Sequence, residues 1–225
     1  MRSIVFIAAC ALACSSSPSN GNPDGGTQPL GQPENGRATY YAADGTGACG
    51  FDPSPNDLDV AAMDAPEWNG SAQCGECVQV TGPLGQVTVR IVDECPGCET
   101  GHLDLSQEAF AKIADVSAGN VPITWQVVAC NPQGPVQYYI KDGSSQYWTA
   151  IQVRNSKYAI SKLEWKTGTG AYANVNRVDY NYFLEAKGTG PGPLTVRVTA
   201  VDGRTLEDSL GPVGDGTVVQ GSGQF

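Results

Sequence analysis

Six cysteines between residues 49 and 130 limit what this chain can fold into more strongly than any other feature, and no cysteine follows them. They are Cys49, Cys74, Cys77, Cys95, Cys98 and Cys130. An even number of cysteines in an exported chain predicts three disulfide bonds, which stabilise a domain with a modest core. The two C-x-x-C pairs also fit a zinc site, and the second pair fits a redox motif. Zinc would leave two cysteines over, and a redox motif should open a helix, so we favour disulfides.

The N-terminus predicts export. Arg2 precedes a short apolar run, Ile4 to Ala13, which is too short to span a membrane as a helix and is typical of a secretory signal. A small residue directly before Cys14 has the pattern of a bacterial lipobox. We therefore expect a lipoprotein-type signal peptide at 1–14 and lipidation of Cys14. The alternative is an ordinary signal peptide cut near Ala13.

These signals predict an exported protein, either extracellular or a cell-surface lipoprotein, whose only membrane contact is the lipid anchor. Residues 15–36 consist largely of Ser, Pro, Asn, Gly and Gln. Such a segment cannot bury a core, so we expect a flexible linker there.

Charge divides the remaining chain into two halves. Residues 37–131 carry 3 Lys and Arg against 13 Asp and Glu, whereas residues 135–225 carry 9 against 8. The acidic first half argues against nucleic acid and anionic polymers as partners and favours neutral polysaccharide. The cysteine and charge boundaries coincide at the stiff segment 131–135, where we place the domain border.

Short apolar stretches separated by Gly and Asp-Gly turns predict a mainly β protein. The stretches are VQVTG, QVTVRIVD, ITWQVVA, YYIKD, AIQVRN and LTVRVTAVDG. One helix stands out, because Ser106 can cap it and because Phe110 and Ile113 share its apolar face. We expect a mostly β domain at 37–131 and an all-β sandwich at 135–225.

Two carboxylates flank the Cys95–Cys98 segment, because Asp93 ends a predicted strand and Asp104 precedes the helix. If a disulfide closes this segment, both acids can face one groove, and paired carboxylates on either side of a sugar chain are the groups that cleave glycosidic bonds. The alternative is that Asp104 caps the helix and Asp93 is a turn residue. We expect His102, the only histidine, to pack or to form hydrogen bonds rather than to catalyse.

Strand parity predicts which side of the strand each residue from Trp148 to Arg154 faces. Ile151 and Val153 should face the core of the second domain. Trp148 has the parity of Gln152 and Arg154 and should face solvent with them. An exposed indole needs an explanation, and stacking on the apolar face of a sugar ring supplies one.

Other aromatic residues are less well defined by the pattern. Tyr147 stands at the start of the strand, where parity is unreliable, and periodicity does not decide the side on which Tyr180 lies. Trp125 and Trp165 alternate with apolar residues, so we expect both in a core.

Read together, these residues resemble bacterial expansins over residues 36–225. The matching pieces are GRATYY, ACGF, CGEC, VDECPGC, HLDLSQEAFAKIA, YYIKDGSSQYW and AIQVRNSKYAI. The strand–turn–helix with LDLS is shared with other double-psi β-barrel proteins, such as family-45 endoglucanases and lytic transglycosylases. Among these, expansins alone join the barrel to a second domain with a GSS-aromatic-Trp strand.

The resemblance implies a six-stranded double-psi β-barrel with a short helix, followed by an immunoglobulin-like β-sandwich that binds carbohydrate. It implies loosening of non-covalent glucan contacts in plant cell walls without hydrolysis, on cellulose, xyloglucan or a related polysaccharide. In the barrel groove, Asp104 would be the essential acid, with Asp93 and Thr39 beside it. The family's binding surface on the second domain would comprise Lys141, Tyr147, Trp148 and Tyr180.

The likeness also implies a disulfide pattern, that of plant expansins. It would pair Cys49 with Cys74, Cys77 with Cys130, and Cys95 with Cys98.

The main alternative is a glycan-cleaving enzyme on the same barrel, a lytic transglycosylase or an endoglucanase, with Asp104 as the general acid. Inverting enzymes need a separate general base, for which the chain offers only Asp44 in a Gly-rich turn. We therefore favour a role that is not enzymatic. We expect no cofactor, no metal and no nucleic-acid partner, and we expect a monomer.

Overall fold

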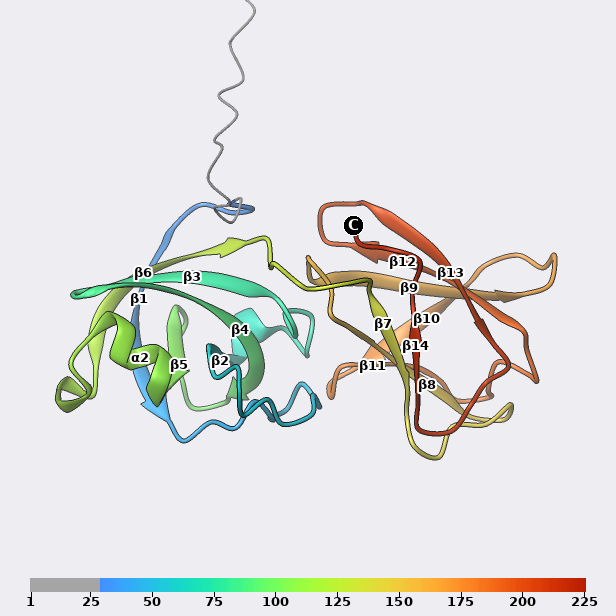
Figure 1. The fold of residues 1–225 in the computed structure, drawn as a ribbon, viewed down its shortest axis with the longest axis horizontal. Helices are drawn as coiled ribbons and strands as arrows, with labels where there is room; N and C mark the ends of the chain where they lie inside the picture. The colour runs from blue at the N-terminus through green and yellow to red at the C-terminus, as the bar shows by residue number, and fades with distance from the viewer. Residues whose placement is uncertain (1–28) are drawn as a thin grey trace, which may run out of the picture.

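The computed structural model describes residues 29–225, which form two β domains placed end to end (Figure 1). The predicted signal peptide, Cys14 and residues 15–28 of the predicted linker lie outside the described residues. The first strand begins at Glu34, so the linker ends earlier than the predicted residue 36. Polar Glu34 and Asn35 pair with Trp125 and Thr124, because ladder hydrogen bonds use backbone groups and need no apolar side chain. Within residues 29–225, no helix has the length and apolar character needed to cross a membrane.

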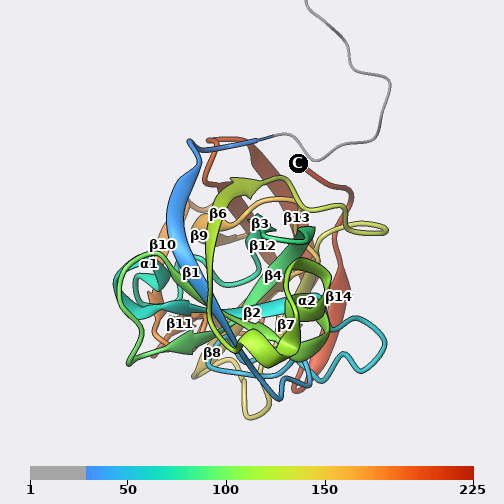
Figure 2. The same cartoon turned by 90° about the vertical axis from the view of Figure 1, so that its left-hand side faces the viewer.

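The first domain is a closed six-stranded barrel with the strand order β1-β5-β2-β4-β3-β6. Its strands are β1 (Glu34–Tyr41), β2 (Val60–Asp64), β3 (Cys77–Gly82), β4 (Gly85–Cys95), β5 (His102–Ser106) and β6 (Val121–Val128). Two pairs, β1 with β5 and β2 with β4, are parallel, and the other neighbours are antiparallel. Figure 2 views this domain from its outer end, with the sandwich behind it.

Three short helices accompany the barrel: α1 (Ala65–Trp68), α2 (Gln107–Ile113) and the 3₁₀ turn η1 (Val116–Ala118). The predicted helix is α2, and its N-cap is Ser106, whose Oγ accepts a hydrogen bond from Ala109 N–H at 3.0 Å. Asp104 therefore does not cap the helix; it lies on β5. Phe110 and Ile113 are buried in the barrel core together with Trp125, as the sequence predicts.

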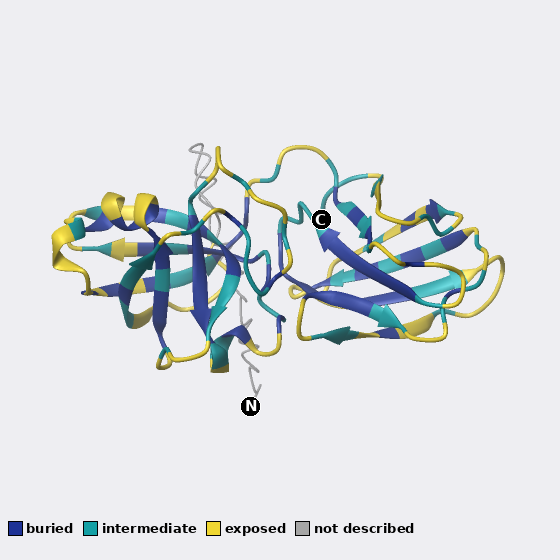
Figure 3. Cartoon of the chain, turned by 90° about the horizontal axis from the view of Figure 1, so that it is seen from below, coloured by how far each residue is buried: buried dark blue, intermediate teal, exposed yellow. Residues whose placement is uncertain are grey.

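The second domain is a β-sandwich. Its strands are β7 (Gln137–Ile140), β8 (Thr149–Arg154), β9 (Ile160–Thr167), β10 (Ala173–Val178), β11 (Tyr182–Glu185), β12 (Leu194–Ala200), β13 (Thr205–Gly211) and β14 (Thr217–Gln220). They are ordered β13-β12-β9-β10-β11-β8-β7-β14, and β10 belongs to both layers because one part pairs with β9 and another with β11. Buried side chains from both layers form one core, and the exposed residues gather in loops (Figure 3). Trp165 packs against this core while staying half-buried.

The sandwich contacts the barrel mainly through hydrogen bonds to main-chain carbonyl groups of the barrel. The side-chain amides of Gln152 and Asn181 both donate to the Cys49 carbonyl, at 2.8 and 3.1 Å. Arg177 Nη1 donates to the Ser71 carbonyl at 3.1 Å, and Ser71 Oγ donates back to the Val178 carbonyl at 2.9 Å. The two bonds to Cys49 are buried and the two at Ser71 are partly buried, and together they fix how the two domains face each other.

This contact corrects one prediction from strand parity. Gln152 is 0% exposed, because its side of β8 faces the barrel and not solvent. Arg154 on the same side is only partly exposed and pairs with Asp52 of the barrel at 2.6 Å. Parity placed both side chains correctly on the face opposite Ile151 and Val153, but it could not show that a second domain covers that face.

Replacing Gln152 with alanine should loosen the two domains, because the Cys49 carbonyl loses a buried donor. We expect unfolding free energy to fall by about 1–3 kcal/mol and protease cleavage between β6 and β7 to become faster. Chemical denaturation and limited proteolysis measure the two effects. The control is Gln146→Ala, which truncates an exposed glutamine; equal behaviour of the two variants would contradict the role of Gln152.

Candidate functional site

The barrel strands place the predicted groove residues in one row. Thr39 on β1 is paired with Asp104 on β5, and Asp104 is paired with Ala62 on β2. Ala62 is in turn paired with Asp93 on β4. Directly paired residues project from the same face of a sheet. Thr39, Asp104 and Asp93 therefore share one face, and the small side chain of Ala62 separates the two acids.

A β-bulge creates this alignment. Along the β2–β4 ladder, Ala61 pairs with Ile91 but Ala62 pairs with Asp93, so Val92 has no partner of its own. Without the extra residue, Ala62 would face Val92. Bulges of this kind redirect side chains and are frequent next to functional sites. The bulge thus brings Asp93 level with Asp104.

Asp93 also holds the loop that borders the groove. Its Oδ1 accepts hydrogen bonds from the N–H groups of Ala48 at 2.6 Å and Glu94 at 2.9 Å. The loop approaches so closely that a Cβ on Gly47 would lie 2.4 Å from the Cβ and Cγ atoms of Asp93. Glycine is therefore required at position 47 for the loop to reach the carboxylate.

Asp104 lies at the end of a chain of hydrogen bonds. Thr39 Oγ1 donates to Asp104 Oδ1 at 2.5 Å and lies 2.8 Å from His102 Nε2. Arg37 Nε donates to His102 Nδ1 at 3.2 Å. His102 is buried, and the expectation that it forms hydrogen bonds is confirmed.

Tyr41 is a further groove residue, two positions after Thr39 on the same side of β1. Its hydroxyl is buried and finds no hydrogen-bond partner among residues 29–225. Burial, followed by the charges of Asp93, Asp104 and Asp44, raises the pKa of the phenol well above its usual value. The phenol therefore keeps its proton at neutral pH.

A pair of acids, the buried Asp64 and the half-buried Glu67, supports the loop beyond β4. Asp64 Oδ2 and Glu67 Oε2 both accept from the N–H of Gly101, at 3.1 and 3.0 Å. Burial, and then the neighbouring Asp64 carboxyl, raises the pKa of Glu67 to about 8. Near neutral pH one proton is therefore held at this pair, next to the groove.

All six cysteines of the barrel form disulfides, so neither zinc binding nor a free dithiol fits them. The bonds join Cys49 to Cys74, Cys77 to Cys130 and Cys95 to Cys98, as the resemblance to plant expansins implies. Within residues 29–225 no cluster of three or more His, Cys, Asp or Glu has the geometry of a metal site.

The predicted residues of the second domain form two neighbouring groups. Tyr147 and Trp148 lie in the hairpin between β7 and β8; Tyr147 is 75% exposed and Trp148 is half-buried. The parity argument for Trp148 is thus only partly right, because the residue lies in the turn before β8.

Lys141 and Tyr180 meet through a residue that the sequence analysis missed, Tyr182. The Lys141 ammonium lies 5.5 Å from the centre of the Tyr182 ring, and the Tyr180 ring centre lies 5.7 Å from it. Tyr139 continues the row at 6.3 Å, and the Arg154 guanidinium lies 4.1 Å from the Tyr139 ring centre. The tyrosine row, Tyr139–Tyr182–Tyr180, therefore lies along the contact with the barrel, and Tyr180 is its exposed member at 39%. Tyr139 is paired with Gln152, and Tyr182 is 5% exposed, so both rings lie on the side of the sheet that faces the barrel.

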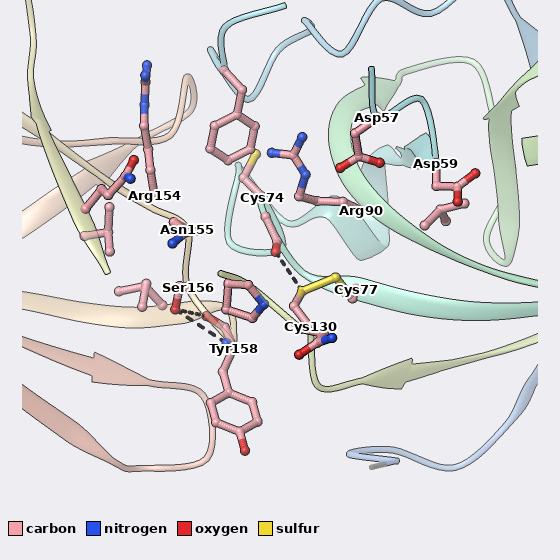
Figure 4. Close-up of a pocket in the computed structure, with 18 of the residues that line it drawn as sticks. Asp57, Asp59, Cys74, Cys77, Arg90, Cys130, Arg154, Asn155, Ser156 and Tyr158 are labelled. Atoms are coloured by element: carbon pink, nitrogen blue, oxygen red, sulfur yellow. Dashed lines mark hydrogen bonds between the residues drawn. A yellow bond between two sulfur atoms is a disulfide. The ribbon is translucent and has the colours of Figure 1, made fainter. Parts of the chain in front are cut away.

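A cavity of about 480 Å³ also lies between the two domains (Figure 4). Arg90 and Asp57 line it from the barrel, and Arg154 and Asn155 line it from the sandwich, beside the Cys77–Cys130 disulfide. It does not contain any of the predicted groove or surface residues. The cavity follows the connection between the domains and is separate from the groove.

A family model described as a lytic transglycolase matches residues 34–125, which are the barrel. Expansin-YoaJ of Bacillus subtilis (strain 168) is 38% identical over 180 residues, covering 78% of this chain and 77% of the relative. The chain belongs to the expansin family.

Solved structures agree with this membership. The apo expansin of Clavibacter michiganensis covers 86% of this chain with 98% of its own, at 34% identity and a TM-score of 0.78. A mutant of the same expansin, in complex with cellohexaose, matches with the same coverage and identity and a TM-score of 0.79. The predicted expansin fold, a double-psi barrel followed by a β-sandwich, is confirmed.

Replacing Gly47 with alanine should impair the groove of this expansin, because the new methyl group would displace Asp93 or the loop at Ala48. We expect weaker glucan binding with disulfides intact, measured by pull-down on cellulose. Gly223→Ala is the control, since a Cβ there meets nothing within 4 Å and the backbone is not in the left-handed region. Full binding by Gly47→Ala would contradict the need for close approach.

Proposed function

We propose that this protein binds cellulose-type glucan in the barrel groove and on the aromatic face of the sandwich. There it loosens non-covalent contacts between wall polysaccharides without cleaving them. The observation that carries the proposal is the likeness, at 34% identity over 86% of the chain, to an expansin solved with cellohexaose.

The groove suits a neutral polyol chain. The row from Thr39 to Asp93 spans three strand-to-strand steps, roughly 14 Å, and so can contact several sugar units. Carboxylate oxygens of Asp104 and Asp93 offer acceptors for sugar hydroxyls. These groups support binding by hydrogen bonds along the chain.

Three hydrogen-bonding patterns argue against hydrolysis. Asp93 and Asp104 are two strands apart, about 10 Å between Cα atoms, a spacing that an inverting pair can have. However, Asp93 already uses Oδ1 to hold two backbone N–H groups. Asp44, the other candidate base, accepts from both the hydroxyl and the N–H of Thr46, which lowers its pKa and makes it a weaker base. Thr39 donates to Asp104 and so uses that acid as an acceptor.

A lytic transglycosylase is the second candidate, because the model that matches the barrel carries that description and because a single acid can suffice for that reaction. The acidic barrel and the aromatic second domain favour the first proposal.

We further propose that the protein acts outside the cell and is anchored through a lipid on Cys14. Fatty-acid labelling of the wild type and of a Cys14→Ser variant would test this anchor.

The decisive test measures wall extension and glycan cleavage on the same sample. We expect the wild type to extend cellulosic walls under load and to release neither reducing ends from cellulose or xyloglucan nor anhydro-muropeptides from peptidoglycan. Asp104→Asn should abolish extension, because one acceptor oxygen becomes a donor. Cleavage products that disappear in Asp104→Asn would establish the enzymatic alternative.

For the sandwich, Tyr147→Ala and Trp148→Ala should each weaken binding to crystalline cellulose. A stacked ring contributes about 1 kcal/mol, which corresponds to roughly fivefold in affinity. Leu84→Ala is a matched control, because Leu84 is a barrel residue that is 71% exposed, close to the 75% of Tyr147. Unchanged depletion isotherms for both aromatic variants would refute the stacking surface.

A further inference from the structure

We propose that Arg37 and His102 act as positioning residues that fix the direction of the Thr39–Asp104 hydrogen bond, so that Asp104 presents one defined face to the glucan. The inference deepens the function proposed above and rests on it for the identity of the ligand. It concerns four side chains on one face of the β1–β5 ladder, Arg37 paired with His102 and Thr39 with Asp104, with the Ala38–Leu103 pair between them.

The direction follows from which groups are able to donate. Arginine has donors only, so the bond from Arg37 Nε requires His102 Nδ1 to be an unprotonated acceptor. A neutral imidazole then carries its proton on Nε2, which donates to Thr39 Oγ1. The hydroxyl proton of Thr39 remains for Asp104 Oδ1. Every bond thus runs from the guanidinium toward the carboxylate.

The surroundings of His102 oppose a second proton. A protonated Nδ1 would place two donors and two positive charges against each other at Arg37. The charged groups around the ring are Arg37, Asp104, Asp64 and Glu99. Burial and then Arg37 lower the pKa of His102 below its ordinary value of 6.5, and the three acids offset this in part.

Lowering the pH should weaken the hydrogen bonds around His102. Since the folded-state pKa is lowered, the stability that neutral His102 contributes is present above about pH 6.5 and is lost as the pH falls toward the folded-state pKa. Protonation would break the bond from Arg37 and release the ring from its fixed orientation. Glucan binding should therefore decline on acidification through the titration of His102.

The tautomer is directly measurable, because the chain contains one histidine. Long-range ¹H–¹⁵N spectra of the labelled full chain at pH 7.5 should show a protonated Nε2 and an unprotonated Nδ1. Arg37→Met removes the donor and should let the tautomers mix. Lys112→Met is the matched control, since it removes another partly exposed cation that pairs with Asp59 at 2.6 Å. Protonation of Nδ1 in the wild type would overturn the inference.

Two variants separate positioning from packing. His102→Gln supplies one acceptor and one donor but cannot titrate near neutrality, whereas His102→Phe keeps a ring and supplies neither. We expect His102→Gln to bind cellulose like the wild type, with a flatter pH profile, and His102→Phe to bind roughly three- to tenfold more weakly. The ¹³Cγ resonance of Asp104 should move in His102→Phe and stay near its wild-type value in His102→Gln.

These outcomes distinguish failure of the inference from failure of the proposed function. If the wild type neither binds cellulose nor extends walls, the proposed function fails, while the tautomer and the Asp104 resonance still decide whether the hydrogen bonds are directed as described. If the wild type is active and His102→Phe has the same binding, pH profile and Asp104 resonance, the positioning role is wrong.

Discussion

The pairing of Ala62 with two different acids is the constraint on which the groove depends. Strand β2 lies between β4 and β5, so one small residue has Asp93 on one side and Asp104 on the other. Barrel closure sets the distance between the acids, and the bulge at Val92 sets their common level. A larger side chain at position 62 would separate the two carboxylates from a shared ligand. Shape and chemistry of the groove therefore follow from backbone register more than from any single interaction of the acids.

The two domains carry different kinds of polar and aromatic groups. Acceptors concentrate in the barrel groove, where they can bind hydroxyl groups, while aromatic rings concentrate on the sandwich, where Lys141 and Arg154 lie over tyrosine faces. Under the proposed function, a neutral polymer chain would use both surfaces, with polar contacts in the first domain and stacking in the second. The contact between the domains fixes the two surfaces relative to each other.

The sequence predicted most of this architecture but not the features that arise between distant segments. Apolar stretches predicted the barrel strands β3, β4 and β6, and the Ser106 cap predicted α2. The family likeness supplied the complete six-stranded barrel and the disulfide pairing. Three features needed coordinates. Gln152 was expected to be exposed because strand parity cannot show that another domain covers a face. Tyr182 was missed because β11 pairs with β8, which is far away in the sequence. The row through Ala62 depends on a β-bulge, and the sequence pattern does not reveal it. The sequence does show polar residues at alternate positions on two strands: Arg37, Thr39 and Tyr41 on β1, and His102 and Asp104 on β5. This alternation marks the groove face.

The way in which Gln152 and Asn181 hold the Cys49 carbonyl has an evolutionary consequence. A carbonyl oxygen is the same in every amino acid, so these two bonds do not depend on which side chain the barrel residue carries. Substitutions on the barrel loop are therefore compatible with them, whereas Asp52, which pairs with Arg154, and Gly50, whose φ is +64°, are constrained. The Cys49–Cys74 bond anchors that carbonyl and is the covalent fixed point of the arrangement. Changes in the groove strands can therefore leave this contact between the domains intact.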